Sequence, residues 1–289
     1  MGHEHSTPPL AVITGAGGLI GSYLMRSAGA LAPEWRVSGL SRRDLDLADP
    51  QAIRRTVQTV RPALIIHCAA ISKTTQCQQD PLLARRINVE ATTLLAELAC
   101  DVPFIFFSSD LVFDGKKGRY VETDPVSPLN VYGETKVAAE RIVLANPRHS
   151  VIRTSLTAGR SPTGDRSFVE EMRQALKAGQ PLTLFTDEYR CPIPASASAR
   201  AVWELVRVNR PGLYHLAGAE RLSRWEIGQL LLARWPDLHT EIRPGSLKDY
   251  RGGPRSADAS LDCRKLQALL SFPLPSFREW ALDRQNEEV

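Results

Sequence analysis

The chain has 289 residues, 43% hydrophobic and 24% charged, which suits a globular protein with a main domain and a smaller one. The net charge of +4 is mild and the arginines are dispersed, so we expect no nucleic-acid partner. The five cysteines and six histidines lack metal-ligand spacing, and no secretory signal or membrane-length apolar run is visible, so we expect no metal, no membrane span and a cytoplasmic protein.

Short apolar runs alternate with longer amphipathic stretches through the first half of the chain. This alternation is typical of an α/β fold with a doubly wound parallel sheet and helices on both faces. We expect strands at Leu10–Thr14, Arg36–Leu40, Ala63–Cys68, Val102–Ser108 and Val151–Thr154, and helices at Leu19–Ala30, Pro50–Val60, Pro81–Ala99 and Val131–Leu144.

The second half is less regular and is rich in loops that contain Gly, Pro and Ser. We expect helices at Ser167–Ala178, Ser198–Val208 and Ser223–Trp235, and strands at Leu182–Phe185 and Leu213–Ala217. The division that follows is a disordered tail at 1–9, a main domain at 10–155 rejoined by a segment near 195–217, and a smaller substrate-binding domain formed mainly by 156–289.

Three glycines follow the first expected strand and open the first expected helix. Gly15, Gly18 and Gly21 are three residues apart, which suits a tight turn, a close approach to a pyrophosphate and close packing of helix on strand. The free N–H groups of the helix start would face the anion. The pattern predicts a Rossmann-type NAD(P)-binding domain; the alternative is a glycine-rich turn that binds nothing.

Two arginines, Arg42 and Arg43, follow the second expected strand about twenty residues beyond the glycine loop. A carboxylate here is typical of NAD sites, whereas arginine suits the 2′-phosphate of NADP. We therefore expect NADP(H) as the preferred cofactor. NAD(H) stays open, because Asp44 and Asp46 lie close by.

A tyrosine and a lysine lie four residues apart at the start of an expected helix. Tyr132 and Lys136 therefore share one helical face, where an ammonium would lower the pKa of the phenol from about 10 and suit it to acid/base catalysis. Ser109 lies at the carboxyl end of the strand expected at Val102–Ser108, where parallel sheets bind ligands. We expect Ser109, Tyr132 and Lys136 to be catalytic, with Asp110 orienting a polar group or only capping a turn.

With these residues in hand, the chain resembles the extended short-chain dehydrogenases/reductases, and more narrowly the dTDP-4-dehydrorhamnose reductase family. The resemblance covers almost the whole chain. It rests on Ser108-Ser-Asp-Leu-Val-Phe-Asp-Gly115 and on Glu122-Thr-Asp-Pro-Val-Ser-Pro-Leu-Asn-Val-Tyr-Gly-Glu-Thr-Lys136, with further matches at Leu45-Asp-Leu, Ala69-Ala70, Arg153-Thr-Ser155 and Arg255-Ser-Ala-Asp-Ala-Ser-Leu-Asp262.

The resemblance implies reduction of the 4-keto group of a nucleotide-linked deoxysugar by a nicotinamide dinucleotide. Ser109 would take the place of the family's catalytic threonine beside Asp110, Tyr132 would donate the proton, and Lys136 would contact the nicotinamide ribose. It also implies cofactor contacts at the pyrophosphate from Gly18, Leu19 and Ile20, at the adenine from Asp46 and Leu47, and at the middle of the cofactor from Ala69, Ala70 and Ile71.

The chain departs from the family pattern on the substrate side. Leu156 replaces an aromatic residue that packs on the sugar, and Thr75 replaces an aspartate. The family's Asp-Gln-x-Gly-x-Pro-Thr reads Asp187-Glu-Tyr-Arg-Cys-Pro-Ile193, so Arg190 would hold a substrate phosphate or form a surface ion pair. Leu156 and Arg190 are therefore candidate substrate-binding residues beside Ser109 and Asp110.

We therefore expect an NADPH-dependent reductase of a keto group on a nucleotide-sugar-like small molecule, with a homodimer left open. One alternative is a nucleotide-sugar epimerase or dehydratase that holds NAD tightly. A dehydratase typically needs an Asp-Glu pair after the catalytic hydroxyl, and here only Asp110 is present. The other alternative is a catalytically idle dinucleotide-binding subunit that regulates a partner enzyme.

Overall fold

A six-stranded parallel sheet forms the centre of the structure, a computed structural model that describes residues 7–238 and 241–283. All its neighbouring strands pair in parallel, so every carboxyl end lies at one edge. Across the sheet the strands are β2 (Arg36–Leu40), β1 (Leu10–Thr14), β3 (Leu64–His67), β4 (Phe104–Ser109), β5 (Ser150–Thr154) and β10 (Gly212–Leu216).

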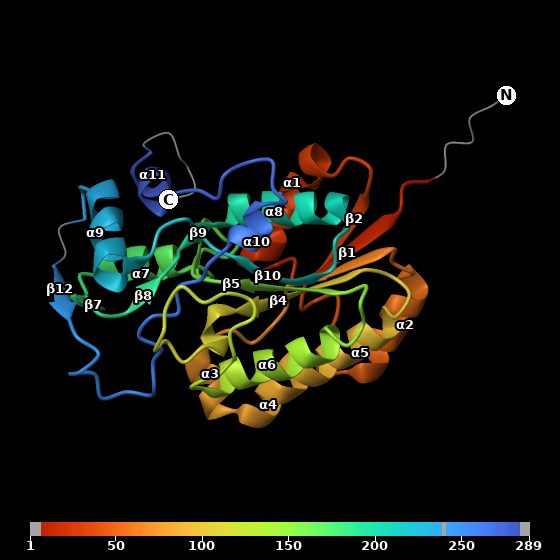
Figure 1. Cartoon of the computed structure of the whole chain (residues 1–289), viewed down its shortest axis with the longest axis horizontal. Coiled ribbons are helices and arrows are strands. Elements are labelled where there is room, and N and C mark those ends of the chain that lie inside the picture. The colour runs from red at the N-terminus through yellow and green to blue at the C-terminus, as the bar shows by residue number, and fades with distance from the viewer. Residues whose placement is uncertain (1–6, 239–240, 284–289) are drawn as a thin grey trace.

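Helices cover both faces of this sheet (Figure 1). On one face α1 (Leu19–Leu31) packs against α8 (Ala195–Val208), and on the other lie α2 (Pro50–Val60), α5 (Ala91–Leu98) and α6 (Val131–Val143). The two largest hydrophobic clusters fill the space between the sheet and these two layers. The fold is therefore α/β and Rossmann-type, as predicted.

The strand order reverses between β1 and β3. The chain leaves β1 through α1 to reach β2 on one side, and then returns through α2 to β3 on the other side. The loops that follow β1 and β3 therefore diverge to opposite faces, and ligands of open α/β sheets bind at such a point.

The strands expected in the first half are all present, with ends shifted by one or two residues. The single helix expected at Pro81–Ala99 is wrong in detail, because a π-helical turn at Arg86–Glu90 separates α4 (Pro81–Arg85) from α5. The side chain of Asn88, within that turn, bonds the backbone of Ile71, which accounts for the irregularity. A short helix, α3 (Thr74–Gln79), was not foreseen.

The later part of the chain forms a further hydrophobic cluster, separate from the two beside the sheet, between helices and short strand pairs (Figure 1). Capping boxes start two of its helices, since Ser167 pairs with Glu170 and Ser223 with Glu226. Its helices are α7 (Phe168–Lys177), α9 (Arg224–Arg234) and α11 (Phe277–Leu282), whereas α10 (Arg264–Gln267) packs through Leu266 on the cluster beneath α1 and α8. The short strands of this part are β6 (Thr157–Ala158), β7 (Leu182–Phe185), β8 (Tyr189–Arg190), β9 (Ile193–Pro194), β11 (Leu222–Ser223) and β12 (Ile242–Gly245).

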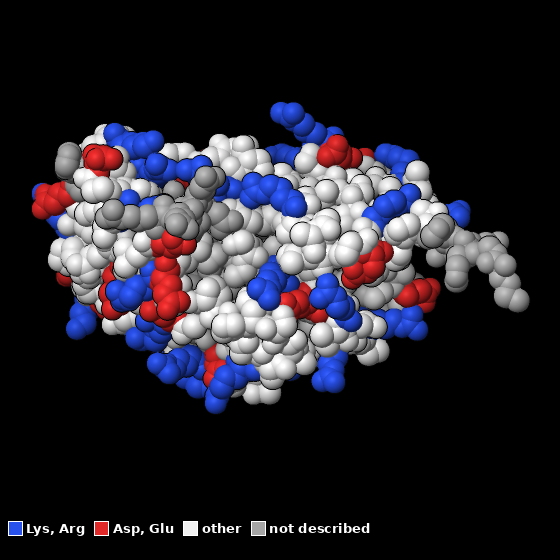
Figure 2. Space-filling view, turned by 90° about the horizontal axis from the view of Figure 1, so that it is seen from above, with Lys and Arg blue, Asp and Glu red and all other residues white. Residues whose placement is uncertain are grey.

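Segment 195–217 returns to the main sheet, where it supplies α8 and the edge strand β10. The expected tail at 1–9 falls mainly on residues 1–6, which lie outside the described residues. None of the described helices is long and apolar enough to span a membrane. Figure 2 shows basic and acidic side chains interspersed over the described part of the face seen from above.

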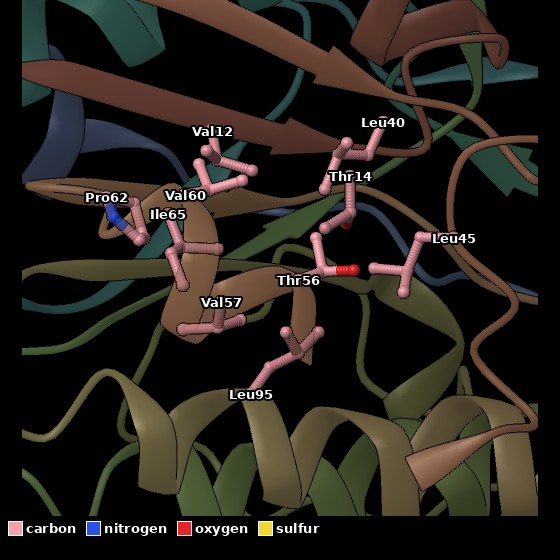
Figure 3. A pocket seen from close by; sticks show the side chains of 10 residues that line it. All are labelled: Val12, Thr14, Leu40, Leu45, Thr56, Val57, Val60, Pro62, Ile65 and Leu95. Atoms are coloured by element: carbon pink, nitrogen blue, oxygen red, sulfur yellow. The ribbon is translucent and has the colours of Figure 1, made fainter. Parts of the chain in front are cut away.

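A small apolar cavity lies between α2, α5 and the central strands (Figure 3). Ile65 and Leu95, both about 1% exposed, contribute side chains to its wall. A site with unfilled space on one side cannot compensate easily for further loss of volume. The cavity is lined by Val12, Thr14, Leu40, Leu45, Thr56, Val57, Val60, Pro62, Ile65 and Leu95.

Truncation of Leu95 to alanine is expected to lower the free energy of unfolding by about 2–5 kcal/mol, because it enlarges this cavity and removes buried apolar contacts. Urea denaturation measures the change. Leu82→Ala is the matched control, since Leu82 is 80% exposed and its loss should stay within about 0.5 kcal/mol. Equal costs for the two variants would contradict this account of the core.

Candidate active site

The glycine loop turns sharply at the carboxyl end of β1. Gly15 has a left-handed φ of 73°, and its N–H donates to the carbonyl of Leu40 at 2.8 Å. A Cβ at Gly15 would lie 2.7 Å from the backbone nitrogen of Ala69, and one at Gly21 would overlap the carbonyl oxygen of Gly15. Glycine is therefore required at both positions to pack β1, β3 and α1 together.

Helix α1 starts at this turn with Gly18 as its N-cap, and no side chain of the described residues caps it. Leu19 and Ile20 form its first turn, with their side chains against the core and their backbone N–H groups at the helix start. A helix start of this kind presents partial positive charge to an anion. The expected pyrophosphate contacts Gly18, Leu19 and Ile20 thus lie together.

The segment that follows β3 is held by hydrogen bonds from the side chain of Asn88. Ala69 lies against the glycine turn, and Ala70 and Ile71 continue beside it, half-buried. The side chain of Asn88 accepts from the N–H of Ile71 at 2.8 Å and donates to its carbonyl at 3.0 Å. These two hydrogen bonds, both to the backbone of Ile71, hold the segment beside the glycine turn.

The end of β2 presents its basic residues to solvent. Arg42 and Arg43 are both exposed. Asp44 is engaged locally, because its carboxylate accepts from the N–H and the hydroxyl of Ser41 at 2.8 and 2.7 Å. Those hydrogen bonds also hold the pKa of Asp44 below its ordinary value.

The expected adenine contacts lie further along the same loop. Asp46 accepts from the N–H of Ala48 at 2.9 Å and is exposed, while Leu47 is half-buried and packs against the cluster beneath α2. Both therefore lie, like Arg42 and Arg43, in the connection between β2 and α2.

Ser109 and Tyr132 meet at the carboxyl end of β4. They are 7% and 8% exposed, and their side chains are near enough for Ser109 to lower the pKa of the Tyr132 phenol. The hydroxyl of Ser109 also donates to Asp110 Oδ1 and accepts from the N–H of Leu111, each at 3.1 Å. Asn130 caps α6 and thereby places Tyr132 in its first turn. The predicted grouping of Ser109, Asp110 and Tyr132 is present.

Lys136 lies one turn further along α6, on the same buried face as Tyr132. Its Nζ donates to the carbonyl of Phe107 at 2.9 Å and lies 5.7 Å from the centre of the Tyr132 ring. Burial lowers the pKa of Lys136 to about 8. The ammonium is thus bound to the backbone of β4 rather than to the phenol.

The expectation that Lys136 lowers the pKa of Tyr132 is not met in this structure. Burial raises the pKa of Tyr132, the hydrogen bond from Ser109 opposes this, and the charge of Asp110 raises it further. Removal from water dominates here, because the neutral phenol needs far less solvation than the phenolate. Tyr132 is therefore a protonated group at neutral pH.

Arg190 is placed differently from either expectation. It is 5% exposed, so it is neither a surface ion pair nor a free phosphate ligand. Its Nε lies 3.6 Å from Asp110 Oδ2, which also accepts from the hydroxyl of Ser155 at 2.7 Å. Leu156, the other substrate-side candidate, is half-buried and packs on the cluster of the second half.

Known proteins resemble this chain along almost its whole length. The family model described as RmlD substrate binding domain matches residues 11–287. The chain belongs to this family. A dTDP-4-dehydrorhamnose reductase from Sinorhizobium fredii is 28% identical, covering 96% of this chain and 99% of that protein. The methionine adenosyltransferase 2 subunit beta of Xenopus laevis is 30% identical, covering 90% of this chain and 82% of the subunit.

A solved structure shows the same fold. The dTDP-4-dehydrorhamnose reductase of Bacillus anthracis, crystallised in complex with NADP, aligns with a TM-score of 0.86 at 24% identity. The alignment covers 96% of this chain and 98% of that one. The likeness concerns the fold, and it extends beyond the sheet to the cluster of the second half.

This RmlD-family chain also places groups in the site that the sequence analysis missed. Glu140 on α6 accepts from Ser108 and forms a buried ion pair with Arg153 at 2.7 Å. Asn88 holds the loop after β3 through Ile71, and Ser155 donates a hydrogen bond to Asp110. Glu140 follows Lys136 by four residues and therefore lies on the same buried face of α6. This spacing is the sequence signal that could have placed Glu140 near the site.

Gly21→Ala is expected to lower the thermal midpoint of the apo protein and to abolish dinucleotide binding, because the new Cβ would displace the carbonyl of Gly15. Thermal denaturation with and without NADPH measures both effects. Gly29→Ala is the control on the same helix: nothing lies within 4 Å of its Cβ, so it should stabilise by up to about 1 kcal/mol. A Gly21→Ala protein that keeps its midpoint and its binding would refute this assignment of the turn.

Proposed function

We propose that the chain is an NADPH-dependent reductase of the keto group of a nucleotide sugar of the dTDP-4-dehydrorhamnose type. The observation that carries the proposal is that two buried hydroxyl side chains, Ser109 and Tyr132, lie near enough to affect each other's protonation at the sheet edge that also bears the glycine loop. A reductase of this name from S. fredii matches the chain end to end, which supports the substrate class.

The residues of the chain divide the chemistry between them. Tyr132, protonated at neutral pH, donates its proton to the carbonyl oxygen of the substrate. Ser109, whose single O–H points at Asp110 in this structure, turns it to the same oxygen when the substrate binds. Both hydroxyls polarise the carbonyl toward attack at carbon. Lys136 anchors α6 to β4 through the carbonyl of Phe107. NADPH, when bound, supplies the hydride.

The arrangement suits a dinucleotide. Apart from Ala16, the turn from Gly15 to Gly18 is made of glycine, and the uncapped start of α1 follows it directly. Gly15, Gly18, Leu19, Ile20 and Gly21 would hold the pyrophosphate, and Ala69, Ala70 and Ile71 would border the middle of the cofactor. We assign residues 10–155 with 195–217 to cofactor binding, and 156–289 mainly to substrate binding.

The preference for NADP over NAD rests on the end of β2. Arg42 and Arg43 are exposed and available to a 2′-phosphate, whereas Asp44 is occupied by Ser41 and Asp46 by Ala48. Each carboxylate keeps its second oxygen open among the described residues, so the preference rests on the two arginines and not on the loss of an acceptor. The NADP complex of the B. anthracis reductase is consistent with this preference.

Tyr132→Phe is expected to lower turnover of dTDP-4-dehydrorhamnose by on the order of a hundred- to ten-thousand-fold, because it removes the proton donor. NADPH oxidation measures turnover, and thermal shift should show that NADPH binding is retained. Tyr214→Phe is the control, since Tyr214 is also buried but its hydroxyl bonds to Arg210 away from the site. Wild-type turnover by Tyr132→Phe would end the catalytic assignment.

Wild-type protein that binds NADPH without turning over any nucleotide-linked 4-keto sugar would count against the reductase proposal itself. That outcome would favour the alternative of a catalytically idle dinucleotide-binding subunit, and the match to a protein named as a subunit of methionine adenosyltransferase 2 is consistent with it. Protein isolated with NAD already bound would favour an internal redox cycle instead.

Replacing Arg42 and Arg43 together by alanine is expected to weaken NADPH binding by about tenfold or more, because charge-assisted hydrogen bonds to the 2′-phosphate are lost. NADH affinity should change little. Fluorescence titration with both cofactors measures the ratio, and Arg36→Ala, at the opposite end of β2, is the control. Equal losses for NADPH and NADH would show that these arginines do not read the 2′-phosphate.

A further inference from the structure

A line of alternating charges, buried as far as Glu188 and ending at the exposed Arg255, runs from the proposed active site into the second half of the chain. It begins at Asp110, after β4, and continues through Arg190 on β8 to Glu188 and Arg255. The side chains of Asp110, Arg190 and Glu188 are each no more than 6% exposed. Charges this far from water persist only when each has a partner of opposite sign.

Each nitrogen of the Arg190 guanidinium faces a partner. Its Nε faces Asp110, and its Nη2 lies 3.2 Å from Glu188 Oε1. Its Nη1 donates to the carbonyls of Tyr189 and Ser256 at 2.7 and 2.9 Å. The planar group is therefore fixed in one orientation, with its Nε edge toward the active-site carboxylate.

Glu188 is held just as firmly from its other side. Arg255 donates to both of its oxygens, at 2.7 and 3.0 Å. Burial raises the pKa of Glu188, but the hydrogen bonds from Arg255 and the charge of Arg190 outweigh it, so the pKa lies below its ordinary value. Glu188 is thus an ionised anchor for Arg190.

Asp110 contacts the reacting hydroxyl of Ser109 directly. Its Oδ1 accepts from Ser109, its Oδ2 accepts from Ser155, and its charge acts on Tyr132. The orientation of its carboxylate therefore decides where the hydroxyl of Ser109 points. A rotation of this one group would break the contacts of both serines.

We propose that Arg190, locked by Glu188 and Arg255, is a positioning residue that orients the Asp110 carboxylate against Ser109 and stabilises its negative charge. The inference deepens the proposed reductase function and rests on it for its catalytic meaning. Arg190 stands where the related family pattern has glycine, and Glu188 where it has glutamine, so the device belongs to the departures of this chain rather than to the shared pattern.

The electrostatic balance at Asp110 supports this role. Burial raises the pKa of its carboxyl, and the charge of Arg190 is the largest opposing cause, ahead of the hydrogen bonds from Ser155 and Ser109. Loss of Arg190 would leave burial unopposed. The ionisable groups that act on Asp110 from the elements around it are Arg190, Glu188, Tyr132 and Cys191.

The test follows the Asp110 carboxyl in protein without cofactor or substrate. Its carbon resonance in ¹³C-aspartate-labelled protein, assigned by its loss in Asp110→Asn, is titrated in wild type and in Arg190→Gln. The pKa of Asp110 is expected to rise by about one to three units in Arg190→Gln. Arg190→Lys keeps the charge and should restore most of the wild-type value. An unchanged titration in folded Arg190→Gln overturns the proposal.

Arg221→Gln is the matched control for loss of an arginine. Arg221 pairs with Asp258 at 2.8 Å, outside the line of charges, and its removal should leave the Asp110 titration unchanged. A shift as large as that of Arg190→Gln would overturn the specific role of Arg190. The carboxyl titration decides the proposal even if the wild type proves inactive, so the two failures are distinguishable.

If Arg190→Gln fails to fold, the double variant with Asp110→Asn decides the matter. Removing both charges should restore folding or raise the thermal midpoint above that of Arg190→Gln alone, since an unpaired buried carboxylate is the source of the instability. Failure of Asp110→Asn to restore any stability would overturn the pairing. In active protein, Arg190→Gln should lower kcat and move the acidic limb of the pH profile upward, with NADPH affinity retained.

Discussion

The removal of polar side chains from water at the carboxyl ends of β3, β4 and β5 is the constraint on which the site depends. Ser109, Asp110, Tyr132 and Lys136 are all buried, although each needs hydrogen-bonding or charged partners. The protein supplies these from the backbone of β4, from Ser155 and from Arg190. Burial also sets the direction of the pKa of Tyr132 and of Lys136.

Two networks of buried charged side chains supply these partners, one on each side of Ser109. Beneath α6, Glu140 and Arg153 form a buried pair that also engages Ser108, directly before the reacting serine. Toward the second half of the chain, Arg190 and Glu188 engage Asp110, directly after it. Ser109 is therefore held between two ionic networks, so the position of a single hydroxyl depends on side chains from both halves of the chain.

Local patterns made much of this predictable from the sequence. Hydrophobic alternation located the strands, and glycine spacing located the turn at which β1, β3 and α1 pack together. The meeting of Ser109 with Tyr132 followed from a strand end and a helix start. The environment of these groups was not predictable, because the pKa of Tyr132 depends on burial, and Arg190 meets Asp110 only through tertiary folding. Asn88 interrupts a helix for a partner, Ile71, that no helical pattern reveals.

The edge strand β10 has a consequence for the order of events during synthesis. It pairs with β5 along five positions, from Gly212 to Leu216, yet it leaves the ribosome some sixty residues after β5 does. Until then β5 is an open edge, with unpaired backbone groups beside the incomplete site, and such edges invite pairing with other chains. The nascent protein therefore passes through a window in which Ser109, Tyr132 and Lys136 have been made while the strand that closes the open edge of β5 has not.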